Sequence, residues 1–391
     1  MENKADLLNS GDFKELCKLL DLSFPNVKPF RETFCHTCNE LPENYNTHLV
    51  IRDKGKVVSH LGVFPMMMKV HGGGILRIGG IGGVATYKEY RGQGFMSLLV
   101  EKALEEMKGK YDISWLGGDR RRYENFGWEN GGRKMIFTLT KRSVKKIKVQ
   151  KFDIRKCKKE TKYLDALEKL HDKEWLGLKR SHTESKLIYN RIKKDIYLAF
   201  KGSRLFSYMV INVNREQGNK KLCTAHVNEY GGELEGIKAL AKYVIEKLGC
   251  YKITVTTPVY NNKYKELFTG MTSLVSIYAY GEMLKIISLK GILKSYERHM
   301  NLKFKNSKIK TKAKITLIIK DTGEAVTLNI GKGVKVTGKI SPKKMILNSK
   351  DMVRLLFGLT KPSDDFKLSA DFAALDLIFP LDYFFWENET V

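Results

Sequence analysis

The chain has 391 residues, of which 42% are hydrophobic and 29% are charged, and its formal net charge is +27. This length predicts two or three domains, and the composition is typical of a soluble globular protein. The sequence contains no run of about 18 apolar residues, which excludes a transmembrane helix.

The charge is spread unevenly along the chain. Residues 1–140 carry a net charge of +3, residues 141–285 carry +16 and residues 286–391 carry +8. Most of the excess is lysine, whereas specific phosphate and base contacts favour arginine, and no aromatic binding motif is interleaved with it. A solvated lysine-rich face is therefore favoured over nucleic-acid binding, and recruitment of an anionic partner or cofactor is the alternative.

The cysteines point to a reducing compartment. The first twenty residues mix acidic and basic side chains without an apolar segment, so no secretory signal is expected, and we predict a cytoplasmic protein with reduced thiols. Cys35 and Cys38 form a Cys-x-x-Cys, but no second close pair is present to complete a zinc site. We expect these two residues to pack from a helix, and a metal or redox role is the less favoured alternative; no metal is predicted.

Alternating and helical patterns follow one another in residues 1–145. The expected elements are strands within 47–70, a strand at 75–86, a helix at 92–107, a strand at 111–117, a short helix within 119–128 and a strand at 133–143. The helix presents one apolar face, made of Met96, Leu99, Val100, Ala103, Leu104 and Met107. This order predicts an α/β sheet with helices packed against it.

The rest of the chain predicts two further units. A basic stretch at 141–162 reads as a linker or an edge, after which the element order of the first unit recurs loosely. From about residue 286 the pattern changes to a helical segment, a strand meander at 312–340 and two helices, at 348–359 and 368–380. We predict an α+β protein with domains at 1–145, 146–285 and 286–391.

The join between the strand at 75–86 and the helix at 92–107 carries the clearest signal for a ligand. The first turn of a helix has free N–H groups at the positive end of the helix dipole, which favours a bound phosphate. Gly92 and Gly94 allow a close backbone approach and positive φ angles, and Arg91 adds a fixed charge. The expected donors are the amides from Gln93 to Ser97. The Rossmann and Walker patterns are absent.

This join resembles the acetyl-CoA pyrophosphate loop of the GCN5-related N-acetyltransferases (GNAT), whose pattern is [QR]-x-x-G-x-[GA]. Arg91 to Phe95 match it, and Met96 stands where the pattern has a small residue. Met96, the "GGIGGVAT" lead-in and the "Y-x-x-F-G-W" at 123–128 resemble the branch of the enhanced intracellular survival (Eis) acetyltransferases. That branch has two tandem GNAT domains, of which only the first is active, and a C-terminal domain similar to sterol carrier protein 2 (SCP2). The three predicted units fit this plan.

The resemblance also implies roles for single residues. The main chain of Val84, Ala85 and Thr86 would pair with the pantetheine arm of acetyl-CoA. The pyrophosphate would be lined by Arg91, Gly92, Gln93, Gly94, Phe95 and Met96. Tyr123 matches the general acid, and the terminal carboxylate, here that of Val391, matches the general base, although family members usually end in an aromatic residue.

The implied reaction is direct transfer of an acetyl group from acetyl-CoA to a primary amine in a ternary complex. The family's acceptors are of the aminoglycoside, polyamine or lysine type, and its members assemble into trimers or hexamers. A chain at +27 would repel a polycation at low salt, so either the cleft is locally acidic or the acceptor is less cationic.

Less specific interpretations remain beside these. Tyr123 could pack beneath the next strand, Val391 could belong to a frayed tail, and Arg120, Arg121 and Arg122 could either grip the 3′-phosphate of CoA or face solvent. The competing function is a non-catalytic basic protein that binds an anionic macromolecule or a lipid, with the first unit as a relic.

Overall fold

The structure is a computed structural model, and it describes residues 4–157, 162–175, 177–191, 194–215, 223–260, 262–279 and 282–391. The chain separates into two compact units. Unit 1 comprises residues 1–132, 279–383 and 391, and unit 2 comprises residues 133–278 and 384–390. Three mixed sheets and their covering helices confirm the predicted α+β class. None of the described helices is long and apolar enough to cross a membrane.

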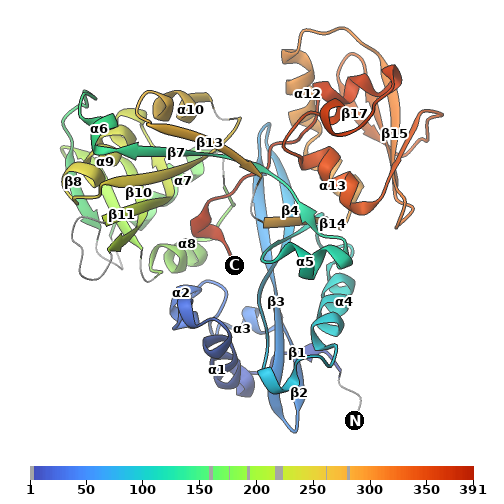
Figure 1. The fold of residues 1–391 in the computed structure, drawn as a ribbon, viewed down its shortest axis with the longest axis horizontal. Helices are drawn as coiled ribbons and strands as arrows, with labels where there is room; N and C mark the ends of the chain where they lie inside the picture. Colours follow the sequence, from blue (N-terminus) through green and yellow to red (C-terminus); the bar gives the residue numbers. More distant parts are fainter. Residues whose placement is uncertain are drawn as a thin grey trace. The chain divides into compact units, whose positions relative to one another are not determined.

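The first sheet lies in unit 1 and has the strand order β1-β2-β3-β4-β5-β14-β6 (Figure 1). Its strands are β1 (Asp6–Leu7), β2 (His48–Asp53), β3 (Lys56–Val70), β4 (Gly74–Thr86), β5 (Ile113–Gly117), β14 (Glu282–Ile286) and β6 (Glu129–Asn130). β4 and β5 pair in parallel, and the other neighbours are antiparallel. The strands predicted within 47–70, 75–86 and 111–117 are therefore present.

Helices cover both faces of this sheet. They are α1 (Phe13–Ser23), α2 (Phe30–Thr33), α3 (Pro42–Tyr45), α4 (Phe95–Met107) and α5 (Arg120–Tyr123). Because successive strand residues face opposite ways, Val50 packs in the core beneath α1, whereas Leu49 and Ile51 pack in the core beneath α4. Figure 1 shows α1 and α4 on opposite sides of β3. Burial of the apolar stripe of α4 is what fixes the end of that helix beside β4.

The third sheet, also in unit 1, has the strand order β17-β16-β15-β18. Its elements are α11 (Leu289–Ser295), α12 (Glu297–Asn306), β15 (Ala313–Ile319), β16 (Ala325–Ile330), β17 (Val334–Thr337), β18 (Lys344–Leu347), α13 (Ser349–Phe357) and α14 (Pro362–Asp365). The predicted cap of the helix at 348–359 is present, because the Asn348 side chain accepts from the Asp351 amide. The helix predicted at 368–380 is instead a 3-10 segment, Ala370–Leu377, followed by an irregular segment.

The second sheet lies in unit 2 and has the strand order β13-β7-β12-β11-β10-β9-β8. Its strands are β7 (Arg133–Thr140), β8 (Asp153–Cys157), β9 (Asp195–Lys201), β10 (Arg204–Arg215), β11 (Cys223–Gly232), β12 (Lys252–Pro258) and β13 (Leu274–Ala279). The helices are α6 (Lys141–Val144), α7 (Leu164–Lys173), α8 (His182–Tyr189), α9 (Leu234–Glu246) and α10 (Asn262–Thr269). β11 and β12 pair in parallel on either side of α9, as β4 and β5 do on either side of α4. The basic stretch at 141–162 contributes an edge strand, β8.

Two strands pair away from their neighbours in sequence. β7 directly follows the first set of elements but lies in the second sheet, between β13 and β12. β14 follows the second set but lies in the first sheet, between β5 and β6. Sheet pairing is long-range, so a sequence pattern that identifies a strand does not say which sheet it joins. The predicted domain limits at 145 and 285 remain predictions.

Candidate active site

A β-bulge distorts β4 at the glycine-rich stretch. Between the pairs Gly62–Gly82 and His60–Ala85, β4 has one residue more than β3. Gly83 lies in this bulge with a φ of +63°, a conformation that favours glycine. The extra residue bends the strand just before the residues that the family resemblance assigns to pantetheine.

β4 also continues beyond its parallel partner. The last pair that joins β4 to β5 is Ile81 with Leu116, whereas β4 runs on to Thr86. The final residues of β4 therefore have no partner on β5. An open strand edge of this kind can accept an extended molecule that carries amide groups, as the pantetheine arm of CoA does.

A cavity of about 520 Å³ opens at this edge. It is bounded by the end of β4, the following loop, the start of α4, the end of α1 and α5. Its lining residues are Ser23, Phe24, Val84, Ala85, Thr86, Tyr90, Arg91, Gly92, Gly94, Phe95, Met96, Arg122 and Tyr123. The charged side chains in this set are those of Arg91 and Arg122, and their positive charge suits an anionic ligand.

The glycines at the start of α4 leave this cavity open. Gly92 and Gly94 have φ angles of +80° and +79°, and a Cβ added to either would meet nothing within 4 Å. Gly94 is the N-cap of α4, so the free amides of the first helical turn follow it directly. The Nε of Arg91 donates to the Thr86 carbonyl (3.1 Å), which ties the loop to the end of β4. These features fit the phosphate site expected from the sequence.

Tyr123 reaches the cavity from α5. Its side chain is buried, and its ring makes an edge contact with that of Trp128. Burial removes water from the phenolate and raises the pKa of Tyr123 above its ordinary value, although the nearby Arg122 acts in the opposite direction. Tyr123 therefore keeps its proton at neutral pH, as a proton donor must.

Nearly all of the site residues that the sequence analysis named lie together around one cavity. Val84, Ala85 and Thr86 and all of Arg91 to Met96 except Gln93 line one cavity with Tyr123. Val391 is not among the lining residues, but a Cβ built on Gly82 would lie 2.9 Å from its carboxyl carbon. The carboxyl group of Val391 thus lies against β4 one residue before the bulge.

The sequence analysis missed part of the cavity. Ser23 and Phe24 line it from the end of α1, and nothing in the local pattern of α1 indicated that position. Arg122 was left open between phosphate binding and solvent, and it lines the cavity. Arg120 does not line it, because its guanidinium forms ion pairs with Glu129 (2.7 Å) and Glu124 (2.8 Å).

Two buried histidines were also missed. His48 and His60 lie on neighbouring strands, are each about 1% exposed, and contact one another at 2.9 Å. The Nδ1 of His60 lies 2.7 Å from the carbonyl oxygen of Gly83 in the bulge. Two histidines on facing strands of the hairpin predicted within 47–70 were the only sequence signal for this pair.

The Cys-x-x-Cys lies in a turn after α2 rather than in a helix. Cys38 is buried in the core beneath α1, and Cys35 is partly buried. Their position fits the packing role, without the predicted helix.

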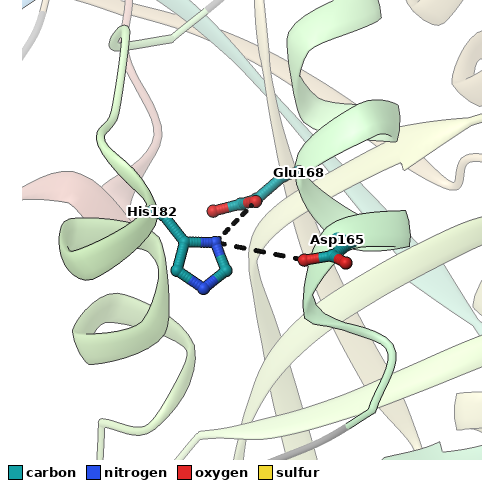
Figure 2. Close-up of side chains that lie close together, drawn as sticks. All are labelled: Asp165, Glu168 and His182. Carbon is teal, nitrogen blue, oxygen red and sulfur yellow. Dashed lines mark hydrogen bonds and ion pairs between the residues drawn. The ribbon is translucent and has the colours of Figure 1, made fainter.

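Among the described residues, the one group of side chains that could share a metal ion is Asp165, Glu168 and His182 (Figure 2). The Nδ1 of His182 lies 3.1 Å from Glu168 and 4.0 Å from Asp165, and the side chains of His182 and Asp165 are 62% and 80% exposed. Lys162 and Lys186 line the same surface depression. Exposed acidic groups beside a histidine are common at protein surfaces, so this group by itself does not indicate a metal site.

Comparison with known proteins identifies the first domain. Residues 4–131 match the family model of the acetyltransferase (GNAT) domain. The fold of the whole chain is similar to that of a probable N-acyltransferase from Enterococcus faecalis (16% identity, 98% of each chain, TM-score 0.73). It is also similar to a GCN5-related N-acetyltransferase from Anabaena variabilis (17%, 97% of each chain, 0.72) and to Eis1 from Mycobacterium abscessus (10%, 100% of each chain, 0.67).

These structural likenesses concern the fold, whereas the family match concerns the segment that contains the cavity. That segment holds the bulged strand, the glycine-lined start of α4 and Tyr123. Residues 4–131 of this chain are thus a GNAT acetyltransferase domain.

Proposed function

We propose that this protein is an N-acetyltransferase that transfers the acetyl group of acetyl-CoA to a primary amine by direct attack in a ternary complex. The observation that carries the proposal is the open end of β4, which leads directly to the glycine-lined start of α4. The pantetheine arm would pair with Val84, Ala85 and Thr86. The pyrophosphate would lie at Arg91 and the first amides of α4.

In this reaction the neutral amine nitrogen attacks the thioester carbonyl carbon, and the C–S bond then breaks. A main-chain amide near Val84 would hydrogen-bond the carbonyl oxygen as negative charge develops on it. Tyr123, whose raised pKa keeps it protonated, would give its proton to the departing thiolate.

The acceptor's proton would pass to the carboxylate of Val391, directly or through one water. A free α-carboxyl has a pKa of about 3.3–3.7, which makes a weak base, so this group also serves to attract the cationic amine. Of the described residues that line the cavity, none is acidic. The carboxylate of Val391 is therefore our candidate for the anionic partner of the acceptor, whether an aminoglycoside, a polyamine or a lysine-type amine.

Unit 2 has the same strand–helix–strand order but a different join. Gly232 ends β11, and a Cβ there would lie 2.1 Å from the Phe206 carbonyl oxygen, so the space is filled by backbone. Glu233 is the N-cap of α9, which places a carboxylate where a phosphate would bind. We therefore infer that unit 2 is a degenerate GNAT-like domain that binds no acetyl-CoA.

The finer features of the family plan are part of the same proposal. They are a C-terminal SCP2-like domain at 286–391, a trimer or hexamer, and a cytoplasmic location. Light scattering after size exclusion would measure the assembly, and a monomer would contradict that part.

The decisive experiment combines binding with turnover. A ligand at 100 times its Kd should stabilise the protein by about 2.7 kcal/mol, so acetyl-CoA should raise the Tm. Release of free CoA should then depend on an amine from a panel of aminoglycosides, polyamines and lysine peptides. Absence of both effects would refute the enzyme. If DNA binding with a strong salt dependence were found instead, it would favour the basic binding protein suggested by the +16 of residues 141–285.

The base role has its own test. A few residues added after Val391 should lower kcat strongly while leaving the Kd of acetyl-CoA unchanged. An extended enzyme with full activity would remove Val391 from the mechanism.

A further inference from the structure

The bulge in β4 needs something other than strand pairing to fix its peptide groups. Beyond Ile81 the strand has no partner on β5, and the bulge interrupts its regular pairing with β3. A peptide group in such a position can rotate unless one of its polar atoms is held. The amide proposed to bind the thioester oxygen lies in this segment.

Side chains hold three carbonyl groups of this segment. Ser59 donates to the Ala85 oxygen (3.1 Å), and Arg91 donates to the Thr86 oxygen (3.1 Å). The oxygen of Gly83, within the bulge itself, faces the Nδ1 of His60 at 2.7 Å. The side chains of Ser59 and His60 are both fully buried, and His60 is the one that contacts the bulge itself.

His60 is one link in a chain of three contacts. The Nε2 of His60 lies 2.9 Å from the Nδ1 of His48, and the Nε2 of His48 lies 3.1 Å from the Thr37 carbonyl oxygen. Both ends of the chain are carbonyl acceptors, so three hydrogens would be needed to satisfy every contact. Burial holds the pKa of His48 at about 3 and that of His60 at about 4, so the two neutral rings carry only two hydrogens.

The distances decide which contact lacks its hydrogen. The contact with Thr37 is the longest, at 3.1 Å, and the contact with Gly83 is the shortest, at 2.7 Å. A ring nitrogen without hydrogen repels a carbonyl oxygen, so the hydrogen belongs on the shortest contact. We assign the hydrogens on this basis, so that His60 donates from Nδ1 to Gly83 and His48 donates from Nδ1 to the Nε2 of His60.

This hydrogen bond sets the direction of the next amide. In a trans peptide the N–H points opposite to the C=O of the same plane. Because the Gly83 oxygen points at His60, the N–H of Val84 points in the opposite direction within that plane, away from His60. Val84 lines the cavity.

We propose that His60 is a positioning residue, supported by His48, which holds the Gly83–Val84 peptide so that the Val84 amide donates to the thioester oxygen of acetyl-CoA. This inference rests on the proposed function, because it assigns that amide its ligand. His60 does not line the cavity, so its proposed effect is exerted through the peptide group.

The test compares His60→Leu, which removes the donor, with His60→Asn, whose side-chain nitrogen can replace Nδ1. His299→Leu is the control, because His299 is also a buried histidine of unit 1, about 2% exposed, and does not line the cavity. We expect His60→Leu to lower kcat by about 100-fold, as loss of one oxyanion donor does, with a change below threefold in the KM for acetyl-CoA. His60→Asn should recover most of kcat, and His299→Leu should retain it.

A second measurement needs no acceptor. Acetyl-CoA labelled with ¹³C at the thioester carbonyl should show a downfield NMR shift when bound to the wild type, and His60→Leu should lose most of it. An equal shift in both proteins, or equal kcat values for the Leu and Asn variants at matched Tm, would overturn the inference. If the wild type itself does not bind acetyl-CoA, the proposed function fails and this inference falls with it; if it binds but no amine reacts, only the proposed acceptor class fails.

Discussion

Gly82 leaves room for the main chain of Val391. A Cβ built on Gly82 would lie 2.9 Å from the carboxyl carbon of Val391 and 3.1 Å from its oxygen. Gly80, on the same face of β4, would place a Cβ 3.0 Å from the Val391 side chain. The glycines of "GGIGGVAT" therefore do more than loosen a strand, because they leave room for the last residue of this sequence to lie against it.

Gly82→Ala should lower kcat by about 10- to 100-fold, because a shift of about 1 Å in a reacting group can have that effect. Gly82 has an ordinary negative φ, so alanine is strained only by the contact with Val391 and Phe64. Gly338→Ala is the matched control, since a Cβ there meets nothing within 4 Å. Steady-state kinetics and Tm values of both variants check this, and full activity in Gly82→Ala would rule out a working role for Val391.

Tyr123→Phe should lower kcat by about 10²-fold and leave the Kd of acetyl-CoA nearly unchanged, since the ring still packs and only the acidic proton is lost. Burial raises the pKa of Tyr123 above 10.0, so the wild-type rate should not fall through this group at any pH below 10. A pH–rate profile and isothermal titration measure the two parts. An unchanged kcat in the variant would remove Tyr123 as the acid.

Arg122→Gln should weaken acetyl-CoA binding by about tenfold, because a hydrogen bond to a charged group contributes about 1.5–3 kcal/mol and solvent around the exposed Arg122 reduces this contribution. Arg121→Gln is the neighbouring control, because Arg121 is exposed and does not line the cavity. Titration with dephospho-CoA distinguishes the phosphates. If Arg122 contacts the 3′-phosphate, Arg122→Gln should bind dephospho-CoA as tightly as the wild type does. Equal weakening of acetyl-CoA binding by Arg122→Gln and Arg121→Gln would instead mean that only the overall charge matters.

Acidification should destabilise unit 1 through His48 and His60. Burial lowers their pKa from 6.5 to about 3 and about 4, so below pH 6.5 the unfolded chain binds protons that the folded protein excludes. Stability from these groups is complete above pH 6.5 and falls by about 1.4 kcal/mol per pH unit for each histidine as pH drops toward 4. Urea unfolding at pH 7, 6 and 5 measures this slope.

His60→Asn should reduce that slope by about half, because one of the two titrating groups is removed. Equal slopes in the wild type and His60→Asn would show that other groups govern the acid transition.

Local chemistry in the sequence was enough to predict the proposed phosphate-binding part of the site. The residues from Arg91 to Met96 are consecutive, and a helix start has the same free amides in any fold, so their grouping could be read without coordinates. The strands and the long helix around them followed from apolar periodicity for the same reason. Tyr123 was predicted to be the general acid because it matches a family motif.

Tertiary structure alone decided everything that depends on contacts distant in sequence. Only the folded chain brings the end of α1 to the cavity and places Val391 against Gly82. It also places β7 in the second sheet and β14 in the first, which the order of the sequence did not indicate. The link between His60 and the Gly83 carbonyl depends on a bulge, which is a change of register between two strands. Register is fixed by side-chain packing on both faces of the sheet. The alternating pattern of one strand does not say which residue of the neighbouring strand lies opposite, so it does not reveal the bulge.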